Sequence, residues 1–289
     1  MIIYLNGNSE DGIYEQFLYP AGEMQVRLTP KGIEEVEKAE EIQIVARIKN
    51  ASDIVELRLI VDAIESINPC PSIIAILPYL PYSRADRRFV NGDCFGLKIF
   101  GDLINTFNRV VTLDVHSLGK AQTNIYNFLN VDPYLLILEA ITHFAYINGA
   151  YTLNVLYPDK GAMERYGLPK MLDDNIQLNI FNCNKNRDPK NGKLLGFSVP
   201  ALPEYPTIIV DDICDGGGTF LGIANEIPKN IPLALYVSHG IFSKGFTDLL
   251  KHFKMIYTTD SITQIDTPKQ IHIQPCLQYI LQGIKNHKN

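Results

Sequence analysis

The chain has 289 residues, enough for two domains of ordinary size, each with its own hydrophobic core. Its net charge of −6 excludes a general nucleic-acid-binding protein, because affinity for a phosphate backbone requires a basic surface. It shows no signal peptide, no apolar run of the ~20 residues that span a membrane and no CxxC spacing among its five cysteines. We therefore expect a soluble cytoplasmic protein without membrane contact, disulfide framework or zinc site.

Strand-like apolar runs alternate with helical patterns along the chain. In the first half the runs 42–48, 72–77 and 109–115 are separated by the helical patterns 51–67 and 95–107, and the same alternation continues in the second half. This order favours an α/β fold with parallel sheets flanked by helices. Because Pro133 opens a helix that leads into a second, similar series, we expect an N-terminal domain over 1–140 and a C-terminal domain over 141–289.

An arginine-rich loop, YLPYSRADRR, follows the strand-like run 72–77. Its planar guanidinium groups, from Arg84, Arg87 and Arg88, suit the oxygens of a polyphosphate. The alternative is a solvated basic loop whose arginines pair with Asp86 and Asp93.

Two polar residues follow strands at the edge where open α/β sheets bind ligands. His116 ends the run 109–115 and is a candidate metal or phosphate ligand, although a buried core histidine is the alternative. Asp159 follows the strand TLNVL within the sequence Pro-Asp-Lys-Gly, which brings a carboxylate to the same kind of edge or forms a plain turn.

The segment 207–220, TIIVDDICDGGGTF, predicts a phosphate-binding loop. Three apolar residues fit a central strand over 207–210, Asp211 and Asp212 form an acidic elbow, and glycines then let backbone N–H groups converge on an anion at a helix start. The acid pair indicates ribose hydroxyls or a phosphate-bound Mg²⁺ as a second partner. A glycine-rich turn with an N-capped helix is the alternative. Neither a Walker loop nor a GxGxxG turn fits the spacing.

The most polar stretch, 182–193, contains Lys185 and Arg187. We expect a mobile loop, and two cations on a closing loop would stabilise charge on a transferring phosphoryl group. Otherwise the stretch is an ordinary exposed basic loop.

These motifs together resemble the ribose-phosphate diphosphokinases, the phosphoribosyl diphosphate synthetases. Eight motifs occur in the same order as in this family and span nearly the whole chain. They are GN near the start, YPAGE, YSRADRR, DVHS, PDKGAMERY, NKNR, VDDICDGGGT and SHGIFSKG. The resemblance implies two tandem phosphoribosyltransferase-like domains with the active site between them. It also implies Mg²⁺-dependent transfer of the diphosphoryl group of ATP to ribose 5-phosphate, and a homo-oligomer in which neighbouring subunits share the adenine site.

The resemblance also assigns a role to individual residues. The ribose 5-phosphate site would comprise Asp211, Asp212, Asp215, Gly216, Gly217, Gly218 and Thr219. The ATP site would comprise Tyr19, Ala21, Gly22 and Glu23 of an adenine-binding hairpin, together with Arg84, Ala85 and Asp86. His116 and Asp159 match the Mg²⁺ ligands, and Lys185 and Arg187 match the basic pair of the catalytic flexible loop.

The chain departs from the family at several positions. Ala21 replaces an aspartate and Tyr19 a phenylalanine of the adenine hairpin, although tyrosine can still stack on a base. Ala85 replaces a glutamine, Asn186 stands in place of a second basic residue, and the segment after His116 lacks most of the family's Gln-Ile-Gln-Gly-Phe-Phe run. Two other functions therefore stay open: a non-catalytic regulatory homologue and a phosphoribosyltransferase.

Overall fold

The computed structural model describes residues 1–5, 12–172, 175–187, 194–262 and 267–287, with the backbone alone for 185–187 and 194–197. Contacts divide the chain into two compact units. Unit 1 comprises Met1–Asp132, Ser261–Thr263 and Cys276–Asn289, and unit 2 comprises Pro133–Asp260 and Gln264–Pro275. The C-terminal helix is thus grouped with unit 1, and a domain boundary near residue 140 remains a prediction.

Unit 1 contains a five-stranded sheet in which all neighbours are parallel, in the order β1-β4-β5-β6-β7. The strands are β1 (Ile2–Tyr4), β4 (Glu41–Val45), β5 (Ser72–Leu77), β6 (Arg109–Leu113) and β7 (Phe128–Val131). A separate antiparallel hairpin is formed by β2 (Tyr14–Leu18) and β3 (Met24–Leu28). β5 and β6 are adjacent, so the segments that follow them leave the sheet at the same edge.

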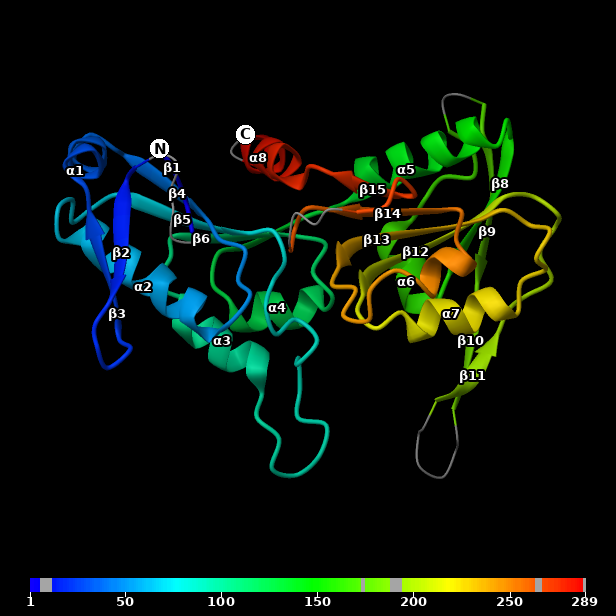
Figure 1. Cartoon of the computed structure of the whole chain (residues 1–289), viewed down its shortest axis with the longest axis horizontal. Coiled ribbons are helices and arrows are strands. Elements are labelled where there is room, and N and C mark those ends of the chain that lie inside the picture. Colours follow the sequence, from blue (N-terminus) through cyan, green and yellow to red (C-terminus); the bar gives the residue numbers. More distant parts are fainter. Residues whose placement is uncertain (6–11, 173–174, 188–193, 263–266, 288–289) are drawn as a thin grey trace. The chain divides into compact units, whose positions relative to one another are not determined.

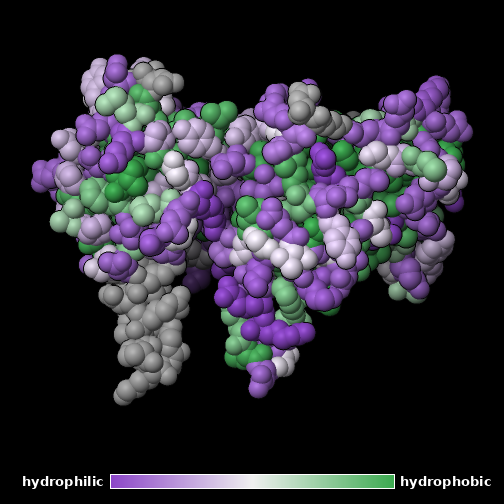
Figure 2. All heavy atoms as spheres, turned by 180° about the vertical axis from the view of Figure 1, so that it is seen from behind, coloured by the Kyte–Doolittle hydropathy of each residue, from purple (hydrophilic) through white to green (hydrophobic). Residues whose placement is uncertain are grey.

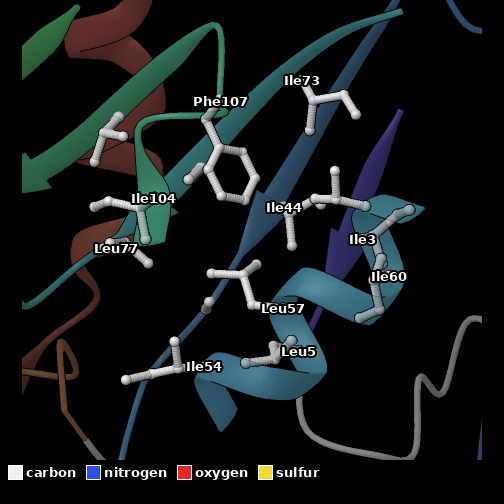
Figure 3. Packing of buried hydrophobic residues seen from close by; sticks show 14 of the residues in the cluster. Ile3, Leu5, Ile44, Ile54, Leu57, Ile60, Ile73, Leu77, Ile104 and Phe107 are labelled. Carbon is white, nitrogen blue, oxygen red and sulfur yellow. The ribbon is translucent and has the colours of Figure 1, made fainter. Parts of the chain in front are cut away.

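Helices cover this sheet through apolar stripes. They are α1 (Pro30–Glu37), α2 (Ala51–Glu65), α3 (Gly96–Ile104), α4 (Leu118–Asn124) and α8 (Cys276–Asn286), and Figure 1 shows α3 and α4 on one side of the strands and α8 on the other. Asn50 caps α2 through a capping box, which satisfies N–H groups of its first turn. Ile54, Leu57 and Ile60, spaced by three residues, belong to one buried cluster with Ile44 and Ile73 of the strands (Figure 3).

Unit 2 contains a six-stranded parallel sheet in the order β15-β14-β13-β12-β8-β9. Its strands are β8 (Thr152–Tyr157), β9 (Gln177–Asn182), β12 (Thr207–Cys214), β13 (Leu233–Gly240), β14 (Met255–Thr259) and β15 (Ile271–Gln274). From β8 the chain runs to β9 on one side and then returns to β12 on the other side of β8. The strand order therefore reverses between β8 and β12, the kind of point at which open α/β sheets bind ligands.

The remaining elements of unit 2 flank this sheet (Figure 1). They are the helices α5 (Tyr134–Ile147), α6 (Lys160–Tyr166) and α7 (Gly218–Asn225), the 3₁₀ turn η1 (Leu249–Lys251), and an antiparallel hairpin of β10 (Asn184–Arg187) and β11 (Leu194–Ser198). α5 begins directly after Pro133, as predicted. A core cluster beneath α7 includes Phe220, Ile223 and Phe253.

The α/β fold predicted from the alternating pattern is confirmed, since both main sheets are parallel and carry helices. Within the described ranges, every helix is too short or too polar to cross a lipid bilayer. Of the five cysteines, all free thiols, Cys183, Cys214 and Cys276 are buried and Cys70 and Cys94 are exposed.

Candidate active site

The acid pair lies inside a strand rather than after it. Pairing of β12 with β13 continues through Asp211, opposite Val237, to Cys214, opposite Gly240, so the elbow expected after residue 210 is wrong. The register with β8 ends earlier, at Ile209 opposite Leu156. The acids therefore extend past the paired part of β8, with Asp212 only 3% exposed and Asp211 partly buried.

Arg165, on α6, holds Asp212. Its Nη1 lies 3.1 Å from Oδ2 of Asp212, and its guanidinium carbon lies 5.7 Å from the centre of the Tyr166 ring. Burial, and after it the neighbouring charge of Asp212, raises the pKa of Asp211 well above its usual value, while Arg165 opposes the shift. The two carboxylates thus differ in their surroundings: Asp212 is paired with Arg165, whereas burial and the charge of Asp212 raise the pKa of Asp211.

A left-handed glycine turns the chain from β12 into α7. Gly217 has φ of +74° and is the N-cap of α7, and no side chain caps this helix. A Cβ on Gly217 would also lie 3.1 Å from Cδ2 of Leu249, so glycine is required for both conformation and space. Gly218 and Thr219 belong to the first helical turn, where backbone N–H groups have no partner within the helix. An anion is the natural partner for such a turn.

The segment after β13 is fastened to this bend. Oγ of Ser243 donates to Oδ1 of Asp215 at 2.6 Å, and the Ser243 N–H donates to the Asp215 carbonyl at 3.2 Å. The N–H groups of Ile241 and Phe242 both reach the carbonyl of Cys214. The side chain of Lys244 runs beside Gly216, where an added Cβ would lie 3.4 Å from its Cε.

Asp159 lies in the same unit, directly after β8. It is the N-cap of α6, and its Oδ1 accepts the Ala162 N–H at 2.9 Å. If the register of β8 and β12 is continued, Asp159 is level with Asp212. Unit 2 thus collects the predicted ribose 5-phosphate residues and one of the predicted metal ligands at the point where its strand order reverses.

Unit 1 collects the predicted residues of the arginine-rich loop and His116 beyond β5 and β6. Asp86 is 3% exposed; it is paired with Nε of Arg87 at 2.9 Å and accepts the hydroxyl of Ser117 at 2.8 Å. The hydrogen bond from Arg87 is the largest cause of the lowered pKa of Asp86, with smaller contributions from Ser117 and His116. Asp86 therefore links the loop to Ser117, the residue after His116. His116 itself is exposed.

Other members of this loop are solvent-facing. Arg84 is exposed, while the carbonyl of Ala85 accepts the Leu97 N–H at 3.1 Å at the start of α3. Phe89 and Val90 are each 66% exposed. Figure 2 shows strongly hydrophilic and strongly hydrophobic atoms together on the extended segment between β5 and α3. Among residues that the structure describes, no three histidine, cysteine, aspartate or glutamate side chains gather as metal ligands do.

The predicted adenine hairpin is the turn between β2 and β3. The Gly22 N–H donates to the Tyr19 carbonyl and the Tyr19 N–H to the Glu23 carbonyl, both at 2.8 Å, with Gly22 at φ +97°. This three-residue turn requires glycine at 22 but tolerates any side chain at Ala21. The tip is exposed, and Tyr19, 49% exposed, makes an edge contact with Phe17 at 5.6 Å between ring centres.

Lys185 and Arg187 lie on β10, whose backbone pairs Lys185 with Phe197 and Arg187 with Leu194. Of the expected loop over 182–193, Asn182 ends β9 and Asn184–Arg187 form β10, while 188–193 lie outside the described residues. Antiparallel pairing with β11, the next strand along the chain, accompanies this conformation, although the intervening sequence is polar and carries no apolar alternation.

Three residues of the site escaped the sequence reasoning. Arg165 was quoted within PDKGAMERY and Ser243 within SHGIFSKG, but neither received a role. Ser117 follows His116 directly. Each contacts a partner far along the chain, so nothing in the local sequence indicates its role except that it lies within one of the family motifs.

Comparison of the sequence with known proteins identifies the family to which the chain belongs. No family model matches the chain. It is 30% identical to the ribose-phosphate pyrophosphokinase of Sulfolobus acidocaldarius over 269 residues, which cover 88% of this chain and 86% of the relative. It is 24% identical to that of Mycoplasmopsis pulmonis over 271 residues, covering 88% and 82%.

A solved structure shows the same fold. The phosphoribosylpyrophosphate synthetase of Mycobacterium smegmatis matches with a TM-score of 0.74 at 18% identity, covering 100% of this chain and 98% of that one. The resemblance expected from the motifs is thereby confirmed. With 30% identity to a relative across most of both chains, this protein belongs to the ribose-phosphate pyrophosphokinase family of enzymes.

Proposed function

We propose that the protein transfers the β,γ-diphosphoryl group of ATP to the anomeric hydroxyl of ribose 5-phosphate, giving 5-phosphoribosyl 1-diphosphate and AMP. The bond from the β-phosphorus to the α,β-bridging oxygen breaks, a bond from the sugar O1 to that phosphorus forms, and the hydroxyl proton is released. This chemistry needs in-line geometry and neutralised charge more than covalent help from the protein.

Binding of the sugar is assigned to unit 2. The 5-phosphate would accept N–H groups from the glycine bend and the first turn of α7, comprising Gly216, Gly217, Gly218 and Thr219, with Asp215 braced by Ser243. Asp211 and Asp212 would lie toward the ribose. Their carboxyl oxygens can accept hydrogen bonds from the ribose hydroxyls, and the pairing with Arg165 holds the Asp212 carboxylate in place for this role.

Binding of ATP is assigned to unit 1 and to a neighbouring subunit. The exposed Arg84 offers a fork for phosphate oxygens, while Asp86 acts by holding the loop through Ser117. Tyr19, exposed at the tip of the β2–β3 turn, presents a ring on which adenine can stack. We expect that tip to serve the ATP of another copy in a homo-oligomer, as the family resemblance implies.

Asp159 is a suitable ligand for Mg²⁺, because this ion prefers carboxylate oxygens. Kinase-type Mg²⁺ is held by one or two carboxylates and by substrate phosphates, and Asp159 brings a carboxylate to the edge that carries the phosphate bend. His116, an imidazole, is a less common Mg²⁺ donor and is assigned by resemblance. When bound, Mg²⁺ would neutralise charge on the diphosphate.

Lys185 and Arg187 would stabilise the negative charge that develops in the transition state. The protein supplies no strong general base in this proposal, so fixed positive charge carries the acceleration. A strand of a hairpin is a suitable carrier, because its backbone pairing with β11 sets the spacing of the two cations.

One observation supports the proposal most strongly. A buried acidic strand runs into a left-handed glycine and an uncapped helix start, where the strand order reverses, in a member of this family. This combination suits a sugar that carries a phosphate.

The test is incubation with ATP, Mg²⁺ and ribose 5-phosphate, followed by chromatography of the products. We expect AMP and 5-phosphoribosyl 1-diphosphate in equal amounts. Two findings would contradict this outcome. Consumption of 5-phosphoribosyl 1-diphosphate with a nucleobase, without need of ATP, would indicate a phosphoribosyltransferase. No product and no ATP binding by calorimetry in the presence of Mg²⁺ would indicate a non-catalytic homologue.

A further inference from the structure

The bend between β12 and α7, which includes Gly216 and Gly217, follows acidic residues of the chain. Asp215 opens the bend, and Asp211 and Asp212 precede it on β12. A phosphate dianion bound at the bend is repelled by the carboxylate of Asp215, which opens the bend, and by any charge on the acids of β12 that Arg165 does not offset. The helix start of α7 offsets only about half of one elementary charge. Tight binding of a phosphate here therefore calls for a side-chain cation.

Lys244 is placed to be that cation. Its Cε, Cδ and Cγ line up at 3.4, 3.5 and 3.8 Å from the position of a Cβ on Gly216, so the side chain runs along the bend. The lysine is exposed, and among the described residues it makes no ion pair with a carboxylate. Arg165, another cation of unit 2, is already paired, with its Nη1 3.1 Å from Oδ2 of Asp212.

The backbone that carries Lys244 is held rigidly against the bend. Ser243 makes two hydrogen bonds to Asp215, and Phe242 adopts a left-handed φ of +47° with its N–H on the Cys214 carbonyl. Gly240 makes room for the Phe242 ring, because a Cβ there would lie 2.0 Å from a ring carbon. This fixed backbone lowers the conformational cost of aiming Lys244 at a ligand of the bend.

We propose that Lys244 is a binding residue for the terminal phosphate of the sugar, donating a charge-assisted hydrogen bond to an oxygen that the glycine bend leaves open. The inference rests on the proposed function, because it takes ribose 5-phosphate as the ligand of the bend. Lys244 would set the affinity for the phosphorylated sugar and leave the handling of ATP unchanged.

The test compares Lys244→Met, Lys244→Arg and a matched control, Lys229→Met. Methionine keeps an unbranched chain beside Gly216 but removes the charge, and arginine restores it. Lys229 is exposed in the same unit beyond the other end of α7. Affinity for ribose 5-phosphate is measured by calorimetry, alongside the KM values for ribose 5-phosphate and ATP.

We expect Lys244→Met to weaken ribose 5-phosphate binding by about 10- to 100-fold, the worth of one hydrogen bond to a charged group. Lys244→Arg should recover most of that loss, and Lys229→Met should match the unchanged protein. The KM for ATP and the melting temperature should stay the same in all variants, which excludes a merely structural effect.

Two failures are distinguishable. If the unchanged protein binds ribose 5-phosphate and Lys244→Met binds it equally well, the role of Lys244 is overturned and the proposed function stands. If the unchanged protein does not bind ribose 5-phosphate at all, the proposed function and the role of Lys244 both fall.

Discussion

Arg165 Nη1 lies 3.1 Å from Oδ2 of Asp212, and this ion pair joins α6 to the acidic end of β12. The side chain of Asp212 is 4% exposed and that of Arg165 is 28% exposed, so water screens the pair only partly. Without Arg165, two adjacent carboxylates would lie together in a poorly solvated place. The arginine therefore supports both the fold of unit 2 and the state of the acids.

Arg165→Met should lower the free energy of unfolding by about 2 kcal/mol, below the 3–5 kcal/mol of a fully buried pair because Arg165 is partly exposed. Adding Asp212→Asn removes the orphaned charge, so the double variant should be more stable than the sum of the single effects predicts. Chemical denaturation of the three variants measures this. Lys160→Met, which breaks the exposed pair with Glu164, is the control and should cost less than about 0.5 kcal/mol. Strict additivity would contradict the coupling.

Gly217→Ala should destabilise the protein, whereas Gly218→Ala should not. Alanine at 217 would carry a left-handed φ of +74°, worth about 1–2 kcal/mol, and would press on Leu249. At Gly218, within α7, a Cβ meets nothing within 4 Å, so alanine should leave stability unchanged or raise it by up to about 1 kcal/mol. Denaturant midpoints of the two variants measure the difference, and equal midpoints would contradict the strain at Gly217.

The local parts of this site were predictable from the sequence. The apolar run at 207–210, the three glycines and the helix after them each carry a short-range signal, and they form β12, the bend and α7. The turn at 19–23 was expected from the family resemblance alone, and Pro20 and Gly22 suit the turn that the structure shows there.

The non-local parts were not predictable. Whether β12 stops at residue 210 or continues to Cys214 depends on the length of β13, its partner. The β10–β11 hairpin is local, but its strands adjoin a polar stretch without apolar alternation, so the strand pattern gives no signal for it. The ion pair of Arg165 with Asp212 and the bonds of Ser243 to Asp215 join segments far apart in the chain, and no spacing rule relates them.

Asp211→Asn should stabilise the protein more as the pH rises. The folded-state pKa of Asp211 is raised, first by burial and then by Asp212. The protonated form therefore contributes stability below the unfolded pKa of about 4, and this contribution is lost as pH rises through the folded pKa. Asparagine cannot ionise, so its melting temperature should match that of the unchanged protein near pH 4 and exceed it at pH 8. Thermal unfolding from pH 4 to 8 measures the gap.

Asp86→Asn provides a comparison of opposite sign. The pKa of Asp86 is lowered, chiefly by the hydrogen bond from Arg87, so its ionised form contributes stability above the unfolded pKa that is lost as pH falls. This variant should melt below the unchanged protein at pH 7, and the gap should close only as the pH falls below about 4, through the lowered folded pKa of Asp86. A pH-independent gap in either variant would contradict the assigned shift.

Lys185→Ala and Arg187→Ala should lower turnover by about 10²- to 10⁴-fold with little change in ribose 5-phosphate binding, because their positive charge is needed where the transferred group becomes more negative. Since the β10–β11 pairing is made by backbone groups, alanine leaves the hairpin intact and the melting temperature should not change. Steady-state kinetics with saturating ATP and calorimetry with ribose 5-phosphate separate the two effects. Lys229→Ala, an equal loss of charge elsewhere in unit 2, should keep normal turnover. Near-normal turnover in both hairpin variants would move catalysis away from β10.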